Sequence, residues 1–437
     1  IGIILSGTAT DGTLGLKAIK ANGGITFAQD ETAKYEGMPK SAINAGYVDF
    51  VLPPEKIAAE LASIRKHPFS KGQTPNVLLA DDTGVLKQIE ELLLRKKRID
   101  FSHYKKSTIH RRIMRRMLLN SCKNLKEYSK YLKKNENELE LLYQDLLIHV
   151  TSFFRDPLML KVLTRKVFPA IIKNKKPGDI IRVWIPGCAT GEEAYSLAIC
   201  LMEYLSIKSV HNLSVQIFPT DLNEVSIEKA RAGIFSSNEL NNMSPKRLKH
   251  FFIKNGAVYQ IVKSIRDICV FATHNLLRDP PFSQMDIISC QNVLIYLEPN
   301  AQSRILQSFH YGLKPHGFLL LGKSETTGNS SDLFSVFDKG HNIYNKKNTD
   351  HPVPVNFQVE SYSNPNSGII SKLKTPVKHY ADSDIDREIN KILLSKFVPA
   401  CVVVNNYLEI IQFRGSTSKF LNPSAGRASL NLLKMVT

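Results

Sequence analysis

The chain has 437 residues, of which 43% are hydrophobic and 22% are charged, a composition typical of globular proteins. At roughly 100–200 residues per domain, this length predicts two or three domains. The sequence has no run near the about 18 consecutive apolar residues of a membrane span, and its first residues lack the order of a signal peptide. We therefore expect a cytoplasmic protein that does not insert into a membrane.

The six cysteines are scattered along the chain, without a CxxC pair and mostly among apolar neighbours. This spacing argues against a zinc site and against a disulfide framework, so we expect reduced, packed cysteines and no bound metal. The chain begins at Ile1 inside one apolar run and stops at Thr437 directly after another. We interpret it as a piece of a longer polypeptide.

The two ends of the chain have the patterns of incomplete domains. Residues 1–62 show an apolar run, a Gly-rich turn and a helical pattern, which predicts a partial α/β unit, and the polar stretch 63–75 predicts a linker. Pro, Ser, Asn, Thr and Lys dominate 347–385, which predicts a second linker. Residues 386–437 then open a last domain, with a predicted hairpin at 397–413.

The centre of the chain shows two different patterns. Residues 76–148 contain several stretches with helical apolar spacing and no alternating strand, which predicts a small helical domain. From 149 to 346, short apolar runs alternate with helical patterns, which predicts an α/β domain built from βαβ units around a parallel sheet.

The strongest local signal is a predicted strand, 181–185, that turns through Gly187 and Gly191 into a helix beginning at Glu192 and Glu193. Glycines at such a turn allow positive φ values and let a bulky ligand approach the backbone. Two adjacent carboxylates would repel a pyrophosphate there, whereas one of them would attract the α-ammonium of a methionine moiety. The loop also lacks the spacing of a dinucleotide site or a P-loop. We therefore expect a nucleoside ligand with a cationic tail.

Polar residues follow the ends of the other predicted strands, at the same edge of the sheet. Asp221 can accept hydrogen bonds from ribose hydroxyls, although it is also a candidate N-cap for the helix that begins near Glu224. Asn275 offers a donor and an acceptor to an adenine edge, Leu276 an apolar surface for the ring, and Tyr296 a wall for a transfer channel. Taken singly, each residue type is more often a cap or a core residue.

Upstream of this sheet, residues 151–157 join two aromatic residues to an arginine just before a predicted helix start. Arg155 can hold a substrate carboxylate through two hydrogen bonds, because its planar guanidinium matches carboxylate geometry. The alternative also stands that Phe153 and Phe154 are core residues and that Arg155 pairs with Asp156.

Several of these segments together resemble the CheR family of chemotaxis glutamate methyltransferases, in the family's order and spacing. They are TSFFRDP, VWIPGCATGEEAYSLA, FPTDLN, RAGIF, CQNVLIYLEP and GFLLLGKSE, the first beginning at Thr151 and the last ending at Glu325. The resemblance covers about residues 80–346. It implies a small helical domain at 76–148, followed by a Rossmann-like class I methyltransferase domain at 149–346 that binds S-adenosyl-L-methionine.

The resemblance also implies roles for individual residues. The cofactor contacts would fall on Thr151, Arg155, Glu192 or its neighbour Glu193, Asp221, Asn275, Leu276, Gln291 and Asn292, beside the turn glycine Gly187. Arg155 and Tyr296 would flank the reacting centre and are the catalytic candidates. The sequence departs from the family at His149, where the family often has Asn, and at Gln291, where an Arg usually precedes the Asn-Val pair.

The two end regions resemble other domains of chemotaxis proteins. Residues 1–62 resemble the closing part of a CheB-type methylesterase, in which a GxxxDG turn carries the triad aspartate, which here would be Asp11. Because the serine and histidine of such a triad are missing upstream in this chain, we expect no esterase activity. Residues from about 386 resemble the start of a PAS-type domain, as in fused CheB-CheR-PAS proteins.

These resemblances imply transfer of a methyl group to glutamate side chains of a methyl-accepting chemotaxis receptor or a similar acidic helical signalling protein. A glutamate carboxylate is already ionised at neutral pH, so it can attack the methyl group without a general base. The net charge of +18 is partly concentrated in Lys105, Lys106, Arg111, Arg112, Arg115 and Arg116. This basic helix is either a docking face for acidic receptor helices or a solvated face.

Two other functions remain open. A basic methyltransferase can act on nucleic acid, but the basic residues here are not interleaved with aromatic residues, so we expect no nucleic acid partner. The domain can also bind the cofactor and serve as a signalling scaffold without transfer. Labelling of nucleic acid would favour the first alternative, and cofactor binding without transfer would favour the second.

Overall fold

The computed structural model describes residues 1–66, 83–147, 151–210, 212–241, 243–348, 401–404 and 410–414. Two compact units make up the chain, residues 1–360 and residues 361–437. Most of the two expected linkers, and the departure at His149, lie outside the described residues. Among the helices that the structure describes, none is long and apolar enough to span a bilayer.

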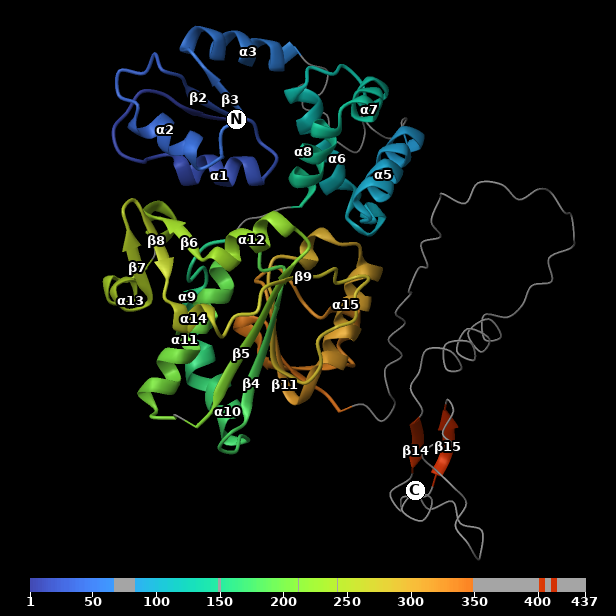
Figure 1. The fold of residues 1–437 in the computed structure, drawn as a ribbon. Coiled ribbons are helices and arrows are strands. Elements are labelled where there is room, and N and C mark those ends of the chain that lie inside the picture. Colours follow the sequence, from blue (N-terminus) through green and yellow to red (C-terminus); the bar gives the residue numbers. More distant parts are fainter. Residues whose placement is uncertain are drawn as a thin grey trace, which may run out of the picture. The chain divides into compact units, whose positions relative to one another are not determined.

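Residues 1–66, here called the amino-terminal segment, form a small three-stranded parallel sheet with three helices (Figure 1). The elements are β1 (Gly2–Ile4), α1 (Thr13–Ala21), β2 (Thr26–Gln29), α2 (Gly37–Asn44), β3 (Phe50–Leu52) and α3 (Pro54–Lys66). Gly12 enters α1 with a φ of 83°, a left-handed conformation that favours glycine. The strand, turn and helix expected at the start are present, whereas β2 and α2 were not anticipated.

A helical domain follows, as the apolar spacing predicts. Its elements are α5 (Thr83–Lys97), η3 (Phe101–His103), α6 (Lys106–Leu119), α7 (Leu125–Lys134) and α8 (Glu136–Leu146). The side chains of Asn124 and Asn135 cap α7 and α8 by accepting hydrogen bonds from backbone N–H groups three residues on. Apolar residues of α5, α6 and α8, among them Leu93, Ile113 and Leu142, meet in one buried core.

The basic helix expected in this domain is α6, but most of its arginine side chains do not face water. Arg112, Arg115 and Arg116 are buried, with only 2%, 2% and 8% of their surface exposed. Arg115 pairs with Asp49 and Asp145, and Arg116 pairs with Glu138. The expectation of a solvent-facing cluster on this helix is therefore wrong for these three arginines, because carboxylates of the same chain pair with Arg115 and Arg116, and the backbone carbonyls of Lys20 and Ala21 accept hydrogen bonds from Arg112.

The next domain contains a seven-stranded sheet. From one edge to the other its strands are β12 (Phe334–Asp338), β13 (Ile343–Lys346), β11 (Leu313–Leu321), β10 (Met285–Cys290), β4 (Ile180–Pro186), β5 (Ser214–Asp221) and β9 (Ala272–Thr273). Neighbours from β11 to β9 run parallel, whereas β13 is antiparallel to both β11 and β12. The predicted α/β fold is confirmed, and the antiparallel end is an addition to it.

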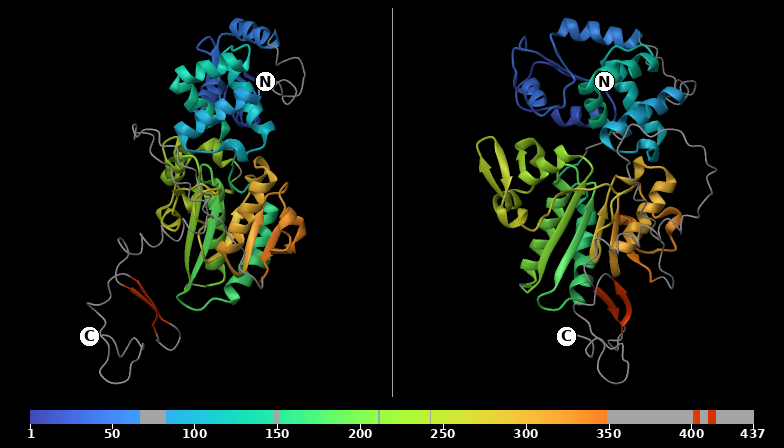
Figure 2. Two further views of the ribbon diagram at one scale, coloured as in Figure 1. Left: turned by 90° about the vertical axis from the view of Figure 1, so that its right-hand side faces the viewer. Right: turned by 45° about the vertical axis from the view of Figure 1, so that its right-hand side comes forward.

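Helices cover both faces of this sheet (Figures 1 and 2). They are α9 (Pro157–Val162), η4 (Leu163–Val167), α10 (Phe168–Lys173), α11 (Glu192–Ile207), α12 (Glu224–Ala232) and α15 (Pro299–Gly312). Side chains alternate along a strand, so Val183 and Ile185 of β4 join the core formed with α10 and α11, and Trp184 joins the core formed with α15. This burial on both faces explains the nearly continuous apolar runs of the strands.

An antiparallel insertion lies between β5 and β9 in the chain. It contains β6 (Ile234–Ser236), η5 (Ser237–Leu240), α13 (Pro245–Phe251), β7 (Phe252–Asn255), β8 (Val258–Ile261) and α14 (Lys263–Arg266), with the strands in the order β6-β8-β7. The remaining short helices are η6 (Leu294–Tyr296), η7 (Gly328–Ser330) and η8 (Lys339–His341).

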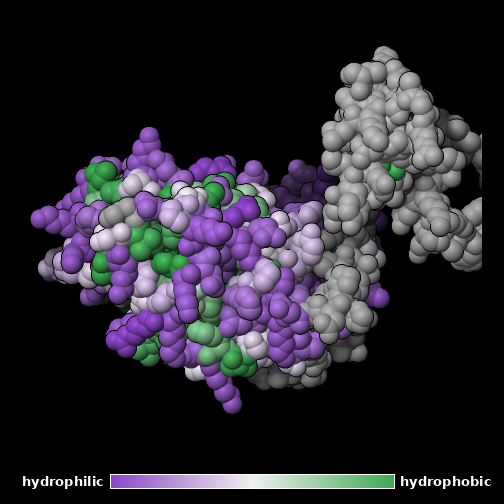
Figure 3. All heavy atoms as spheres, turned by 90° about the horizontal axis from the view of Figure 1, so that it is seen from below, coloured by the Kyte–Doolittle hydropathy of each residue, from purple (hydrophilic) through white to green (hydrophobic). Residues whose placement is uncertain are grey.

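The strand order reverses between β4 and β10, since β5 and β9 lie on one side of β4 while β10 and β11 lie on the other. Ligands of open α/β sheets bind outside the carboxyl ends of the strands at such a point. Figure 3 shows the molecule from below Figure 1, on the side of the amino ends of β4 and β5, where apolar residues form small separate groups among hydrophilic ones. The carboxyl ends of these strands, at the opposite edge of the sheet, are therefore where a ligand is expected.

The second unit contains, among its described residues, the hairpin of β14 (Cys401–Val404) and β15 (Ile410–Arg414). The two strands are antiparallel, with Val402 opposite Phe413. This hairpin agrees with the one predicted at 397–413.

Candidate active site

A cavity lies at the carboxyl ends of β4 and β10. Its walls come from residues 151–163, from the loops after β4, β5, β9 and β10, and from Tyr104, Leu146 and Leu147 of the helical domain. About 1330 Å³ between these walls is free of protein atoms, counting the part that opens to solvent. Small-molecule sites are usually concave and mostly apolar, with a few convergent polar groups, and this cavity has that character, with Leu160 and Leu276 beside Glu193 and Asp221.

The loop after β4 forms one wall of the cavity and depends on its glycines. Gly187 and Gly191 have φ values of 73° and 93°, and Ala189 between them has a φ of 48°. A Cβ at position 187 would collide with the side chain of Val293, so a larger residue there would have to displace Val293 as well as strain the backbone. Left-handed non-glycine residues such as Ala189 are uncommon and occur at binding sites more often than elsewhere.

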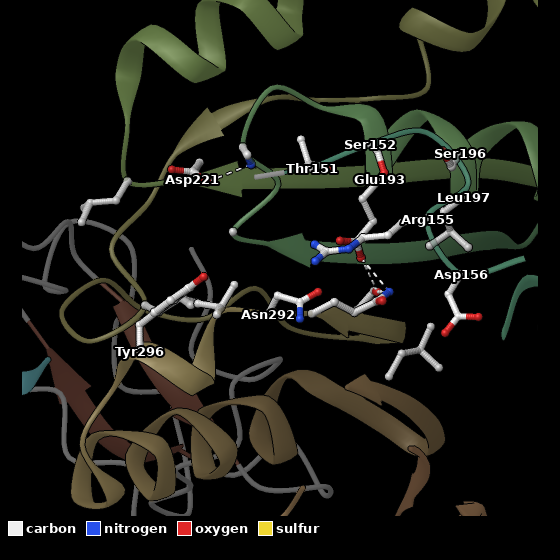
Figure 4. A pocket seen from close by; sticks show the side chains of 18 of the residues that line it. Thr151, Ser152, Arg155, Asp156, Glu193, Ser196, Leu197, Asp221, Asn292 and Tyr296 are labelled. Atoms are coloured by element: carbon white, nitrogen blue, oxygen red, sulfur yellow. Dashed lines mark hydrogen bonds between the residues drawn. The ribbon is translucent and has the colours of Figure 1, made fainter. Parts of the chain in front are cut away.

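The two adjacent glutamates at the start of α11 have different surroundings. Glu193 lines the cavity, and its Oε1 accepts hydrogen bonds from Ser289 Oγ at 2.7 Å and Gln291 Nε2 at 2.9 Å (Figure 4). Removal from water raises the pKa of Glu193 to about 7, although the bond from Ser289 works against this rise. Glu192 is only 1% exposed, accepts a bond from Thr190 Oγ1 and does not line the cavity. Of the pair, Glu193 is thus the residue placed to meet a ligand.

Asp221 lies at the end of β5, where it holds the neighbouring loop. One carboxylate oxygen accepts the backbone N–H of Ala189 at 2.9 Å, as Figure 4 shows, and the other accepts that of Asn223 at 2.9 Å. The N-cap of α12 is Asn223, whose side chain accepts the N–H of Ser226. The helix-cap alternative for Asp221 is therefore wrong, and its carboxylate lines the cavity.

Asn275 and Leu276 follow β9 and also line the cavity. The side-chain oxygen of Asn275 accepts the N–H of Leu277 at 3.0 Å, and its backbone N–H donates to Asp279 at 2.8 Å. The loop thus fixes the orientation of the Asn275 amide, whose NH₂ group is the donor suited to a purine edge.

The loop after β10 carries Gln291, Asn292 and Tyr296, and one buried carboxylate holds it in place. Glu325, 3% exposed, accepts the backbone N–H groups of Asn292 and Val293 at 2.8 Å each, that of Gly322 at 2.7 Å and that of Ile295 at 3.3 Å. Asn292 itself has a φ of 59°. Glu325 was part of a quoted motif but was given no role, since nothing in its spacing shows that it binds backbone groups of a distant loop.

Residues 151–156 form the wall that faces α11. Phe153 packs edge-on against Phe235 and Phe252, so the core interpretation of this aromatic residue is confirmed. Phe154 has a φ of 49°, and its N–H donates to Ser196 Oγ at 2.9 Å, a contact that the sequence did not suggest. The next residue, Arg155, lines the cavity.

Arg155 and Tyr296 line the same cavity, and Figure 4 shows both side chains at it. The charge of Arg155 lowers the pKa of both Glu193 and Tyr296, against the larger effect of burial, which raises them. Asp156 caps α9 and pairs with Lys323 at 3.2 Å. Thr151, Gly187, Gln291 and Asn292 complete the predicted residues at this cavity, so Glu192 is the one predicted residue outside its lining.

Comparison with known proteins connects this geometry to a family. Residues 149–343 match the model described as the S-adenosylmethionine-binding domain of CheR methyltransferase, and residues 85–147 match its all-alpha domain. A chemotaxis protein methyltransferase of Listeria innocua is 32% identical over 54% of this chain and 87% of its own length. The chain belongs to the CheR methyltransferase family. A second relative, chemotaxis protein methyltransferase 2 of Vibrio cholerae, is 29% identical over 60% of this chain and 91% of its own length.

The regions outside the CheR domains also have relatives. Residues 1–61 match the CheB methylesterase model, in agreement with the resemblance seen in the sequence. A 104.1 kDa protein of Rhodobacter capsulatus is 34% identical over the whole of this chain, which spans 48% of that protein, about half of its length. A fused arrangement of CheB-type and CheR-type domains is thus consistent with both comparisons.

The cavity residues fit the cofactor of the CheR family. Glu193 offers a carboxylate for an α-ammonium group, Asp221 for ribose hydroxyls, and Asn275 an amide for adenine. Gly187 lines the cavity with a backbone φ of 73°, a conformation that favours glycine. Among the residues described by the structure, no group of three His, Cys, Asp or Glu side chains is placed to hold a metal ion.

Proposed function

We propose that this chain transfers a methyl group from S-adenosylmethionine to glutamate side chains of methyl-accepting chemotaxis receptors, forming glutamyl methyl esters. The observation that carries the proposal is the single cavity shared by Glu193, Asp221 and Asn275 with Arg155 and Tyr296. The first three suit the cofactor, and the last two suit a second, carboxylate-bearing substrate. The names of the CheR relatives support the same reaction.

The bound cofactor would supply a methyl group on a positively charged sulfur. Glu193 would hold the cofactor's ammonium group, Asp221 its ribose, and Asn275 with Leu276 its adenine. Thr151, Gly187 and Asn292 would form the remaining contacts. Gln291 would act indirectly, because its amide donates to Glu193 at 2.9 Å and to Ser289 at 3.0 Å.

Arg155 would orient the substrate glutamate through two charge-assisted hydrogen bonds. The carboxylate is ionised at neutral pH, so the protein has no proton to remove before the attack. Orientation and exclusion of water then account for the acceleration, and Tyr296 would form the wall on the other side of the reacting atoms.

The remaining assignments belong to the same proposal. The domains would be a CheB-like piece at 1–62, a linker at 63–75, the helical domain at 76–148, the methyltransferase domain at 149–346, a linker at 347–385 and a PAS-like start at 386–437. The protein would act in the cytoplasm, within a two-component chemotaxis pathway, on an acidic helical receptor.

One structural observation weakens the nucleic acid alternative. Three arginines of the most basic helix are buried in ion pairs or hydrogen bonds within the chain, so they are not displayed to phosphates. The scaffold alternative differs from the proposal only in the transfer step, and the experiment therefore has to separate binding from transfer.

The test incubates the full chain with methyl-labelled S-adenosylmethionine and membranes rich in chemoreceptors, then measures label released as methanol by mild base. Arg155→Ala should lower kcat/KM by at least about a thousandfold, because the substrate carboxylate loses its orienting partner. Arg165→Ala removes an exposed arginine outside the cavity lining and should leave the rate unchanged. Full activity in Arg155→Ala would exclude that role; label in nucleic acid, or cofactor binding without transfer, would refute the proposed function.

A further inference from the structure

The amino-terminal segment makes specific contacts with α6 of the helical domain. Arg112 donates hydrogen bonds to the backbone carbonyls of Lys20, at 2.9 Å, and Ala21, while Arg115 Nε donates to that of Gly24 at 3.0 Å. Lys20 and Ala21 are the last residues of α1. The carbonyl end of a helix carries partial negative charge, so a guanidinium group is a favourable partner there.

Arg115 is the centre of this contact, because it binds carboxylates from both sides. Asp49 of the amino-terminal segment and Asp145 of α8 each pair with one of its terminal nitrogens. The Arg115 side chain is 1% exposed, and Lys20 adds a second cation 3.2 Å from Asp49. Burial alone would raise the pKa of Asp49, but the charges of Arg115 and Lys20 hold it below its ordinary value.

The same segment also reaches the methyltransferase domain. Lys17 Nζ of α1 donates to the backbone carbonyl of Thr151 at 3.2 Å, and Thr151 lines the cavity. Asn238 of η5 donates to Ser41 Oγ of α2 at 3.1 Å. The amino-terminal segment therefore contacts both domains that contribute walls to the cavity.

The start of α6 is in turn bonded to the active-site loop. The backbone N–H of Lys105 donates to the carbonyl of Tyr296 at 2.8 Å, and that of Glu298 donates to the carbonyl of His103 at 2.9 Å. A shift of α6 thus acts directly on the loop that carries the catalytic candidate Tyr296. The contacts of the amino-terminal segment reach the cavity through α6 and through Thr151.

We propose that the amino-terminal segment is a clamp, docked on Arg112 and Arg115 of α6 and on the methyltransferase domain, that fixes the two walls of the cavity relative to each other. Arg112 and Arg115 are then an interface within the chain and not a receptor-docking face. A CheB-like domain joined to this segment would have a direct mechanical connection to the methyltransferase site. The inference does not depend on which group the methyltransferase domain transfers.

The test uses the full chain with a protease site inserted between residues 66 and 83. After cleavage, the dissociation constant of the two parts is measured from their co-elution on a sizing column over a concentration series. The wild-type parts should remain together at micromolar concentration. Arg112→Ala removes the donor to two carbonyls of the segment and should weaken the association at least about tenfold.

Lys126→Ala is the matched control, because it removes an exposed lysine from α7 of the same domain and should not change the dissociation constant. Circular dichroism checks folding; if Arg112→Ala does not fold, Lys17→Ala tests the methyltransferase side, with an expected weakening of about threefold. Separation of the wild-type parts would overturn the clamp. So would an unchanged dissociation constant in the folded Arg112→Ala variant, or in Lys17→Ala where that variant replaces it.

Discussion

The arginine cluster of α6 and the cavity at the sheet edge both contain buried acidic groups, but the counter-charges come from different places. At α6, Arg115 and Arg116 of the chain itself neutralise Asp49, Asp145 and Glu138. In the cavity, Glu193 accepts bonds from two neutral groups, and its pKa rises to about 7. An acid paired with a cation of its own chain already has its counter-charge, whereas an acid kept out of water without a full counter-charge is suited to a cationic ligand.

Two further acids, Glu325 and Asp221, differ from the acids paired with arginines at α6 and from Glu193 in the cavity. Glu325 and Asp221 accept backbone N–H groups, four and two respectively, and thereby hold the loops that form the cavity. Their role is to fix the loops of the site in position, not to stabilise a domain. Substitutions at Arg116, Glu325 and Glu193 test these three roles. They are measured by the free energy of unfolding, by cofactor affinity and by the pH dependence of binding, respectively.

The largest effect is expected at the α6 cluster. Arg116→Ala leaves Glu138, 3% exposed, without its bidentate partner, and the free energy of unfolding should fall by about 3–5 kcal/mol. Denaturant unfolding followed by circular dichroism measures the change. The double variant Arg116→Met with Glu138→Leu should recover most of the loss, since it removes both charges together.

Lys130→Ala, an exposed lysine of α7, is the control and should change the free energy of unfolding by less than about 0.5 kcal/mol. If Arg116→Ala changes the free energy of unfolding as little as this control does, the charges of α6 are solvated. The contrast between ion-paired acids at α6 and the acid in the cavity would then be refuted.

The sequence predicts the fold well because its signals are local. Glycines at 187 and 191, apolar runs bounded by turns, and helical spacing each arise within a few residues, and the α/β domain and the helical domain follow from them. The burial of Arg112, Arg115 and Arg116 was missed, because their partners Lys20, Ala21, Asp49 and Glu138 lie 22 to 92 residues away in the chain. Composition shows which charged residues are present, but not which of them pair in the folded chain.

The same limit applies to the site. Asp221, Asn275 and Tyr296 could be named because each follows a predicted strand, and strand ends share one edge. The choice between Glu192 and Glu193 could not be made, since both begin the same helix and only the packed structure shows which one faces the cavity. The role of Glu325 required the contact of its carboxylate with a loop about thirty residues earlier.

The second prediction concerns the acid that holds the loop. Glu325→Gln replaces one acceptor oxygen by an NH₂ group facing backbone N–H donors, so the loop of Asn292 and Tyr296 should loosen. Cofactor affinity, measured by calorimetric titration, should fall about 30-fold, equivalent to about 2 kcal/mol. Asp332→Asn, an exposed acid, serves as the control. Unchanged cofactor affinity in a folded Glu325→Gln variant would show that Glu325 contributes to the structure but not to cofactor binding.

The smallest expected effect concerns Glu193 in the cavity and is measured as the pH dependence of ligand affinity. The pKa of Glu193 is about 7, above its ordinary value of 4.5, so in the ligand-free protein this carboxyl keeps its proton below pH 7. A cationic ammonium group binds the ionised form, and binding below pH 7 must therefore release a proton. Affinity for S-adenosylhomocysteine, measured calorimetrically, should be about tenfold tighter at pH 8 than at pH 6.

Glu193→Gln should abolish this pH dependence and bind at every pH about as weakly as the wild type does at pH 6, because the amide cannot acquire charge. Glu228→Gln, an exposed acid of α12 outside the cavity lining, should retain the full dependence. A wild-type affinity that is constant from pH 6 to pH 8 would show that the ligand's ammonium group does not rely on Glu193. Ser289 and Gln291 would then be the only groups that Glu193 needs as hydrogen-bond donors. The acids at α6 and the acid in the cavity would differ in their burial and not in their function.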